Sequence, residues 1–278
     1  MKLNDSKVTV IIPNYNKGVY LGKCIDSVLK QKGIDLNIIV VDDNSTDNSK
    51  DILLEYQSKY EIIKTIYLKK NSGVSHARNL GATRAVSKYI TFLDSDDFYL
   101  NEYKLKNECD ILDINTCGIS KDVVAYSIWK KTNLDTDICD EIEPNPSRLL
   151  MGNVYSSLLW NKFDFMYLPR DYIIPRDLFL KAGGFNEESN YYEDLELLIK
   201  LSRSAIFMPV LQYGSAYRRV SGGLSNRRIR DSILARTQIF KNELKEECGS
   251  KLKILILTIV FEIRIFLSHI KTIINTYN

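Results

Sequence analysis

The chain has 278 residues, of which 45% are hydrophobic and 26% are charged, and this composition is typical of a globular protein. At roughly 150 residues per domain, the length allows one large domain or two small ones. The apolar content excludes disorder as the main state, and 13 Gly with 6 Pro and no short repeat exclude a collagen-like chain.

The net charge of +3 combines two unlike parts. Residues 1–217 carry a net −4, whereas residues 218–278 carry a net +7, with 12 Lys and Arg against 5 Asp and Glu. The basic tail predicts contact with something anionic, such as a membrane surface, a diphosphate or an acidic partner. A solvated basic helix is the alternative.

The cysteines and the start of the chain set weaker limits. Five Cys without a Cys-x-x-Cys pair indicate neither a disulfide framework nor a zinc site, so a reducing compartment is expected. Residues 1–7 are polar and run straight into an apolar segment, so we expect no signal peptide. The charge-free apolar stretch 254–261 is too short to span a membrane, which needs about 20 residues.

The first hundred residues alternate strand and helix patterns. Apolar runs predict buried parallel strands at residues 8–12, 36–41, 62–68 and 89–93. Helical spacing predicts helices over residues 21–29, after a cap at Thr46 or Asp47, and over 73–86. Such alternation predicts βαβ units with right-handed crossovers, in which ligands bind outside the carboxyl ends of the strands.

The remainder of the chain is less regular. Strands are expected at residues 110–114, 123–129, 172–174 and 205–217, and a surface loop at 135–146. Helices are expected at residues 177–182, 193–201, 228–247 and 251–275. Gly183-Gly184 should stop the first of these helices, and Gly249 should divide the last two.

An acidic segment, Asp94-Ser95-Asp96-Asp97, follows directly on the fourth expected strand. Carboxylates at a buried strand tip repel one another unless a cation neutralises them, and hard oxygen ligands suit Mg²⁺ or Mn²⁺ bound with a diphosphate. One alternative is the N-cap of a following helix. Another is the aspartyl nucleophile of a haloacid-dehalogenase-type phosphatase, which is disfavoured because that family needs Gly-Thr or a close variant after the acidic pair.

Two further polar segments follow the second and third expected strands. Asp43 at the end of the second strand can accept from a ribose hydroxyl or a base N–H of a nucleotide, and helix capping by the next polar residues is the alternative. In the segment 71–81, Gly73 permits a close approach to a ligand, and Arg78 offers a planar cation for stacking or phosphate contact. With only two His in the chain, a Ser-His-Asp triad is not expected.

A fourth segment combines a Gly183-Gly184-Phe185 turn with Glu193 and Asp194 at the start of a helix. The positive helix end keeps such acids ionised, and an ionised carboxylate can act as a general base. Simple compensation of the helix dipole is the alternative reading for the acidic pair.

These segments, in this order, resemble the A-type family 2 glycosyltransferases, a bacterial group of inverting enzymes that use nucleotide sugars. The matching segments are Pro13-Asn14-Tyr15-Asn16, VDDNSTD, NSGVSHARNLG, FLDSDD, GGFNE and YYEDLELLIKLSR. The resemblance covers roughly residues 7–225, and six motifs in order are far more specific than any one of them.

The resemblance implies roles for individual residues. The nucleotide-sugar site would contain Pro13, Tyr15, Asp43, Asn71, Gly73, Arg78, Asp94 and Ser95. Asp94 and Asp96 would hold Mn²⁺ or Mg²⁺, with Asp97 as a helper. Asp194 would be the catalytic base, with Glu193 as its substitute. Arg176 and the GGF turn would shape the acceptor side.

One position departs from the family pattern. Many relatives carry a histidine in the loop after the last strand, where it contacts the metal or the diphosphate, but Val220 stands at that position here. Arg218, Arg219 or Arg227 would then neutralise diphosphate charge instead, unless they belong to a solvated basic surface.

The resemblance therefore implies an α/β A-type glycosyltransferase with a Rossmann-like, mostly parallel sheet flanked by helices and a C-terminal helical extension. Residues 1–227 would form the nucleotide-sugar-dependent domain, and residues 228–278 the basic, amphipathic helices. The expected reaction moves one sugar, most often from a UDP-sugar, to a glycan or lipid-linked acceptor in bacterial surface polysaccharide or lipooligosaccharide synthesis. A phosphohydrolase and a non-catalytic nucleotide-binding scaffold are the alternative functions.

The expected location is the cytoplasm, with peripheral attachment to the inner face of the cell membrane. The apolar C-terminal helix would attach to the membrane surface, pack on the domain, or join copies into a homo-oligomer. Nucleic-acid binding is not expected, because the basic residues gather in the tail without an aromatic platform.

Overall fold

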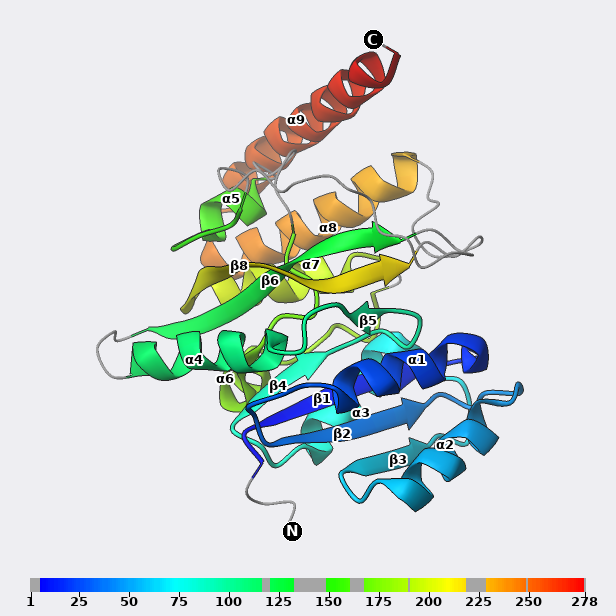
Figure 1. Cartoon of the computed structure of the whole chain (residues 1–278). Coiled ribbons are helices and arrows are strands. Elements are labelled where there is room, and N and C mark those ends of the chain that lie inside the picture. Colours follow the sequence, from blue (N-terminus) through cyan, green and yellow to red (C-terminus); the bar gives the residue numbers. More distant parts are fainter. Residues whose placement is uncertain are drawn as a thin grey trace.

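The computed structural model describes residues 6–116, 121–132, 149–160, 168–189, 191–218, 229–248 and 250–277. Within these residues the chain forms two sheets, with helices around them and two long helices at the C-terminal end (Figure 1).

The first sheet has the strand order β3-β2-β1-β4-β7. Its strands are β1 (Val8–Asn14), β2 (Leu36–Asp42), β3 (Ile63–Tyr67), β4 (Tyr89–Phe92) and β7 (Ile174–Pro175). The first four strands are parallel to one another, and β7 is antiparallel to its neighbour β4. β1 and β2 are buried along their whole length, which explains why both read as continuous apolar runs rather than alternating ones.

Helices cover both faces of this sheet. α1 (Gly18–Leu29) and α2 (Ser49–Lys59) share a core with Val10 of β1, whereas α3 (Val74–Arg84) packs on the opposite face with Ile11. Successive strand residues point to opposite faces of the sheet, so the side chains of β1 pack alternately into the two apolar cores on either side of it. The expected mostly parallel sheet flanked by helices is confirmed.

The second sheet has the order β5-β8-β6. It consists of β5 (Phe98–Tyr99), β6 (Asp122–Thr132) and β8 (Ala205–Arg218), with β6 and β8 parallel and β5 antiparallel to β8. α4 (Lys104–Thr116) leads from β5 towards β6, and α7 (Glu193–Ser202) precedes β8. Two short helices complete this part of the chain, α5 (Tyr155–Leu159) and α6 (Arg176–Lys181).

A buried ionic network joins the two sheets. Lys104 Nζ donates to Glu108 Oε2 at 2.9 Å and to the carbonyl oxygen of Asp171 at 2.7 Å, and Ser127 Oγ donates to Glu108 Oε1 at 2.6 Å. The side chains of Lys104 and Glu108 are 1% and 0% exposed. Burial raises the pKa of Glu108 despite the adjacent ammonium. The network therefore ties α4 and β6 to the segment that enters β7.

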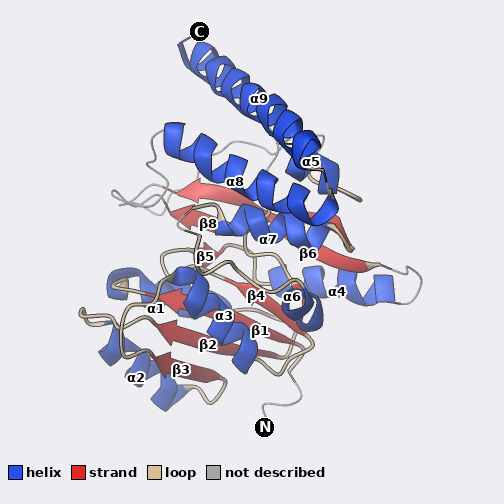
Figure 2. Cartoon of the chain, turned by 180° about the vertical axis from the view of Figure 1, so that it is seen from behind, coloured by secondary structure: helices blue, strands red, loops and turns tan. Residues whose placement is uncertain are grey.

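The C-terminal helices are α8 (Ile229–Glu247) and α9 (Lys251–Tyr277). Phe240 of α8 and Phe261 of α9 stack with their ring centroids 4.1 Å apart, and both are buried in the same apolar cluster as β6 and α7. From this contact α9 runs away from the body of the molecule (Figure 2). No helix among the described residues is both long and apolar enough to cross a membrane.

Several sequence-based predictions of elements are confirmed, and others are wrong. The strands over 123–129 and 205–217 and the helices over 193–201, 228–247 and 251–275 are present with small shifts of their ends. Gly183 and Gly184 end α6 with φ of 82° and 69°. The strand predicted at residues 110–114 is wrong, because this segment belongs to α4.

The apolar residues of α4 explain that error. Leu105, Cys109 and Leu112 recur at a spacing of three and four and are all buried on one helix face. The short run 111–114 resembles a strand only when it is taken alone. The predicted cap of α2 is also displaced, because the helix begins at Ser49 with Asn48 as its N-cap. The loop predicted at 135–146 lies outside the described residues.

Candidate active site

The ends of three parallel strands meet at one edge of the first sheet (Figure 1). β1 ends at Asn14, β2 at Asp42, and Asp94 follows two residues after the end of β4. Because these strands run in the same direction, the polar residues that follow them come together. Asn14 Nδ2 donates to Asp42 Oδ2 at 2.8 Å and to Ser45 Oγ at 3.2 Å, which ties the first two loops to each other.

Asp43 holds the turn that follows β3. Its two carboxylate oxygens accept the backbone N–H groups of Ser72 at 2.7 Å and Gly73 at 2.8 Å. Gly73 has a φ of 91°, and a Cβ at this position would have no heavy atom within 4 Å. The turn therefore needs glycine for its backbone conformation, and the space above it is open. Of the other predicted nucleotide-site residues, Asn71 is exposed in the same turn.

The remaining residues expected around the nucleotide differ in exposure. Pro13 is buried in β1, and Ser95 is 4% exposed. Tyr15, directly after β1, has an exposed fraction of 46%. An exposed aromatic ring at the carboxyl edge of a sheet provides an apolar surface on which a base can stack.

Arg78 joins two acidic segments that are far apart in the chain. Its Nη2 donates to Asp94 Oδ1 at 2.5 Å, and its Nη1 donates to Glu193 Oε1 at 3.2 Å. The guanidinium carbon lies 5.0 Å from the ring centroid of Phe185. Arg78 is 9% exposed. Burial opposes its charge, but Asp94 and Glu193 raise its pKa above the ordinary value, so it stays a permanent cation.

The Gly183-Gly184-Phe185 turn supports this arginine. Asn79 Nδ2 donates to the carbonyl oxygen of Phe185 at 2.9 Å, and Asn79 Oδ1 accepts the Phe185 N–H at 2.9 Å. Phe185 also packs edge-on against Phe92 with centroids 5.0 Å apart. The two sequence motifs 71–81 and 183–187 are therefore one structural unit that positions Arg78.

Arg170 is a second cation at the acidic segment. Its Nη2 lies 3.5 Å from Asp94 Oδ2 and 4.0 Å from Asp97 Oδ2, and its guanidinium stacks 3.9 Å from the ring centroid of Tyr217. Burial alone would raise the pKa of Asp94. The charges of Arg78 and Arg170 have a larger, opposite effect, so the pKa of Asp94 lies below its ordinary value. Both oxygens of Asp94 thus face guanidinium groups.

Asp96 and Asp97 have different surroundings. Asp96 Oδ2 accepts from Lys17 Nζ at 2.7 Å. Asp97 is buried, and its Oδ1 accepts the backbone N–H of Arg218 at 2.8 Å. Burial, together with the charges of nearby carboxylates, raises the pKa of Asp97 well above its ordinary value. Asp97 is therefore placed to hold the end of β8 rather than to contact a ligand directly.

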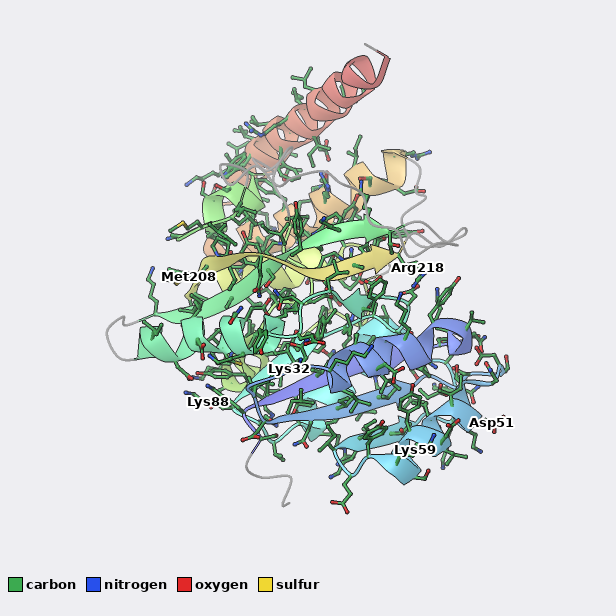
Figure 3. The ribbon with its side chains drawn as sticks, viewed as in Figure 1. Lys32, Asp51, Lys59, Lys88, Met208 and Arg218 are labelled. Atoms are coloured by element: carbon green, nitrogen blue, oxygen red, sulfur yellow. The ribbon has the colours of Figure 1, made fainter. Side chains whose placement is uncertain are left out.

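Arg218 ends β8 beside this acidic segment, where Figure 3 labels it. Its Nε donates to the carbonyl oxygen of Asp96 at 3.0 Å, and its guanidinium carbon lies 4.8 Å from the ring centroid of Tyr20. The other two arginines expected here, Arg219 and Arg227, lie outside the described residues, as does Val220.

Glu193 and Asp194 open α7, as expected. Glu193 is engaged by Arg78, whereas Asp194 Oδ1 accepts the N–H of Leu195 in its own helix at 2.8 Å. The charge of Asp194 contributes to the raised pKa of both Arg78 and Arg170.

Tyr192 sets the start of α7. It has a left-handed backbone with φ of 62°, an unfavourable conformation for an aromatic residue. Its hydroxyl shares a hydrogen bond of 2.6 Å with Ser232 Oγ, and the Arg236 guanidinium carbon lies 4.8 Å from its ring centroid. Because Ser232 and Arg236 belong to α8, a C-terminal helix braces the residue next to the acidic pair.

Asp94 and Asp96 are the carboxylates expected to hold a divalent cation, and in this structure both oxygens of Asp94 face guanidinium groups and one oxygen of Asp96 accepts from Lys17. Two carboxylates supply hard oxygen donors, and Mg²⁺ in phosphate sites keeps waters and takes the rest of its ligands from the phosphates. Within the described ranges, no group of three or more His, Cys, Asp and Glu side chains has the geometry of a metal site. A cation held by these two carboxylates would need further ligands, which the phosphates of a bound substrate can supply.

One alternative from the sequence is not supported by the geometry. The acidic segment 94–97 is followed by β5 and not by a helix, so it does not cap one. Arg176, which the resemblance placed on the acceptor side, donates through its guanidinium to the carbonyl oxygens of Ala82 and Thr83 near the C-terminal end of α3.

Two cations of the site, Lys17 and Arg170, were missed by sequence reasoning. Lys17 follows closely on β1, and the adjacency of β1 and β4 could have indicated its approach to Asp96. Arg170 had no such signal, since 76 residues separate it from Asp94.

Comparisons with known proteins identify the family and the fold of the chain. The family model described as glycosyl transferase family 2 matches residues 9–163. The poly(ribitol-phosphate) beta-glucosyltransferase of Bacillus spizizenii is 33% identical over 210 residues, which is 70% of this chain and 32% of that protein. The TuaG glycosyltransferase of Bacillus subtilis, named for teichuronic acid biosynthesis, is 40% identical over 130 residues, 47% of this chain and 50% of that protein. The chain thus spans between a third and a half of these relatives.

Solved structures share the fold. The crystal structure of S. aureus TarS 1-349 in complex with UDP-GlcNAc matches with a TM-score of 0.67 at 20% identity, over 94% of this chain and 72% of that one. The mannosyltransferase PcManGT from Pyrobaculum calidifontis, in complex with GDP-Man and Mn²⁺, matches with a TM-score of 0.57 at 16% identity, over 88% of this chain and 65% of that one.

Proposed function

Because the chain belongs to glycosyl transferase family 2, we propose that it transfers a single sugar from a nucleotide sugar to a hydroxyl group of a glycan or lipid-linked acceptor. The observation that carries the proposal is the joining of two acidic segments by Arg78 at the carboxyl edge of the sheet. One segment, Asp94–Asp97, suits the diphosphate side, and the other, Glu193–Asp194, suits proton transfer. We place the reaction in bacterial surface-glycan synthesis, which the names of the relatives support.

The donor that we propose is a UDP-sugar. Tyr15 and the open turn at Gly73 flank the space for the nucleoside, and Asp43 lies beneath that turn. Each oxygen of Asp43 accepts one backbone N–H and retains a second lone pair for a base or ribose donor. One solved structure that shares the fold is a complex with UDP-GlcNAc, which supports this choice.

The diphosphate side depends on both carboxylates and cations. Asp94 and Asp96 would hold Mn²⁺ or Mg²⁺, and such a cation neutralises charge on the departing diphosphate. Lys17, Arg170 and Arg218 surround the same segment. Their positive charges favour the diphosphate leaving group in a site that is preorganised before substrate binds.

The acceptor side depends on Asp194. We propose that its carboxylate takes the proton of the acceptor hydroxyl while that oxygen forms a bond to the anomeric carbon. The bond from the anomeric carbon to the phosphate oxygen breaks, and its electron pair leaves with the nucleoside diphosphate. The attack comes from the face opposite the leaving group, so the configuration at the anomeric carbon inverts. The transition state resembles an oxocarbenium ion, as in glycoside hydrolysis.

We propose that residues 1–227 form the donor-binding and catalytic domain and that residues 228–278 form a C-terminal helical extension. The extension supports the site through α8, whose Ser232 shares a hydrogen bond with Tyr192. We propose a cytoplasmic location with peripheral attachment to the inner face of the membrane, where lipid-linked acceptors would be available.

The donor proposal is tested by thermal unfolding with UDP, GDP, CDP and dTDP, each with and without Mn²⁺. A ligand at 100 times its Kd, bound only to the folded state, adds about 2.7 kcal/mol to the free energy of unfolding. We expect the largest shift with UDP, an increase of that shift with Mn²⁺, and loss of the increase in Asp96→Ala. No shift with any nucleotide would contradict the proposal.

The base proposal is tested with Asp194→Asn. The amide oxygen can still accept the Leu195 N–H, so the start of α7 should remain intact. Transfer should fall by about 10²–10⁴-fold, the usual contribution of a general base, with the UDP-induced stabilisation unchanged. Asp177→Asn is the matched control, since Asp177 lies in the first turn of α6 and away from the site. UDP binding without transfer by the wild type would instead favour a non-catalytic scaffold.

A further inference from the structure

Over residues 251–267, where the side chains of α9 are described, one apolar side of the helix contacts the protein and another is exposed. Phe261 and Ile265 are 3% and 0% exposed on the inner side. Phe261 stacks on Phe240 and approaches Trp160, with centroids 4.1 and 6.5 Å apart. These contacts attach the helix to the body and account for the residues on that side.

The opposite side, which we call the α9 outer face, is exposed. Its members are Leu252, Leu255, Ile256, Ile259, Val260, Ile263, Phe266 and Leu267, and their exposed fractions run from 48% to 67%. Their spacing of three and four residues places them on one side of the helix. α9 as a whole extends beyond α8 (Figures 1 and 2). A contiguous apolar patch of this kind marks an interaction site.

Basic residues border the α9 outer face. Lys253 and Arg264 are eleven residues apart, close to three full turns, so they lie in one row along one edge. Lys251 lies beyond the other edge, and all three are exposed. Glu262 is the one acidic residue of α9. The whole segment 218–278 carries a net +7.

Two occupants of the α9 outer face can be compared, a second copy of the helix and an anionic surface. The width of the apolar face and the charge of its borders distinguish between them. In a coiled-coil pair the apolar seam is two rows wide, and charged residues border it with complementary signs. Here the positions beside the seam, such as Leu255, Val260 and Leu267, are apolar too. Two copies of this basic helix would bring like charges together, whereas an anionic surface would attract them.

We infer that the α9 outer face binds an anionic lipid surface, with its apolar side chains in the boundary between headgroups and acyl chains and its Lys and Arg at the headgroups. Apolar burial and attraction to anionic lipid act together in helices that lie in a membrane surface. The long stems of Lys and Arg let their charged ends reach the headgroups. This inference assigns residues to the membrane attachment proposed above, and it does not depend on the transfer reaction.

The test is flotation of the full chain with vesicles of phosphatidylcholine alone and of phosphatidylcholine with phosphatidylglycerol. The wild type should float with the anionic vesicles, and raising the salt from about 0.1 M to about 1 M should weaken this binding, because the screening length falls from about 10 Å to about 3 Å. Binding to both vesicle types without dependence on charge or salt would overturn the electrostatic part of the inference.

Two variants examine the two components separately. Ile256→Ser, Ile259→Ser and Ile263→Ser together should lower the vesicle partition coefficient by at least about tenfold, since apolar area no longer leaves water. Lys251→Gln, Lys253→Gln and Arg264→Gln together should remove the preference for anionic vesicles. All six side chains are exposed, so the fold should tolerate both sets, which far-UV circular dichroism and the unfolding midpoint would check.

A matched control changes exposed apolar residues elsewhere. Ile114→Ser, Met151→Ser and Leu211→Ser replace side chains that are each 71% exposed, and this variant should bind vesicles like the wild type. Failure of the wild type to float with either vesicle type would overturn the inference. In that case a concentration-dependent oligomer in sedimentation, lost in the triple Ile→Ser variant, would assign the face to a second copy of the chain.

Discussion

Arg78 is predicted to be the residue whose loss most disturbs the site, because two carboxylates depend on its charge. Arg78→Met keeps a similar apolar stem but removes the hydrogen bonds to Asp94 and Glu193. The side chains of the three residues are 10%, 28% and 14% exposed. Breaking a buried ion pair from one side costs 3–5 kcal/mol. Since Arg170 remains near Asp94, we take the lower value, about 3 kcal/mol.

This loss should be visible in thermal unfolding. For a chain of this size about 2 °C accompanies each kcal/mol, so the midpoint of Arg78→Met should fall by about 6 °C. Arg84→Met is the matched control, because Arg84 is exposed in the last turn of the same helix. Its expected effect is within about 0.5 kcal/mol.

The effect of Arg78→Met should also depend on pH. The folded-state pKa of Asp94 lies below its ordinary value of 3.8. A group with a lowered pKa contributes stability above its unfolded pKa, and this contribution disappears as the pH falls through the folded pKa. The deficit of Arg78→Met should therefore be larger at neutral pH than below pH 3.8.

A double-mutant cycle tests whether Arg78 stabilises the protein through its charge interaction with Asp94. In Arg78→Met/Asp94→Asn one carboxylate no longer needs a cation, so the double variant should be more stable than Arg78→Met alone, with a coupling energy of at least about 0.5 kcal/mol. Additive effects of the two substitutions, or an unchanged midpoint in Arg78→Met, would refute the electrostatic explanation. UDP-induced stabilisation should decrease in both variants, because the cation beside the diphosphate side is gone.

Two further predictions concern groups that act at a distance from the substrate. Lys104→Met should destabilise the protein by about 3–5 kcal/mol in denaturant unfolding, since it leaves Glu108 buried without its cation. Adding Glu108→Gln to Lys104→Met should recover part of this loss. If no stability is recovered, the ion pair does not account for the loss. Tyr192→Phe should lower kcat and leave KM nearly unchanged, because loss of the hydrogen bond to Ser232 loosens the start of α7 without removing a substrate contact. Ser232→Ala should have the same effect, and the double variant should be little worse than either single one. A change in KM as large as the change in kcat would point to a different role.

Much of the first sheet could be predicted from the sequence for a simple physical reason. A parallel strand is buried on both faces, so β1, β2 and β4 appear as continuous apolar runs between helical segments. The polar residues after those runs must meet at one edge, because parallel strands end together. Asp43 and Asp94 were therefore expected near a common site from local pattern alone.

The second half of the chain was harder to read. β5 has two residues, which is too short for any period to be recognised. α4 was mistaken for a strand over residues 110–114, since its buried residues form a helical face only when the whole element is considered. Parallel pairing of β6 with β8 joins residues about eighty positions apart, and no local signal specifies such a contact.

The acidic residues of the site, and the strand or helix ends at which they stand, follow from local sequence, because strand burial and helix starts are local properties of the chain. Which cation faces which carboxylate depends instead on how distant segments pack together. Arg78, which pairs with Asp94, also reaches Glu193 across 115 residues, and Arg170 reaches Asp94 across 76. The pKa of each acid depends on these contacts and on burial, which are properties of the packed molecule and not of the local sequence.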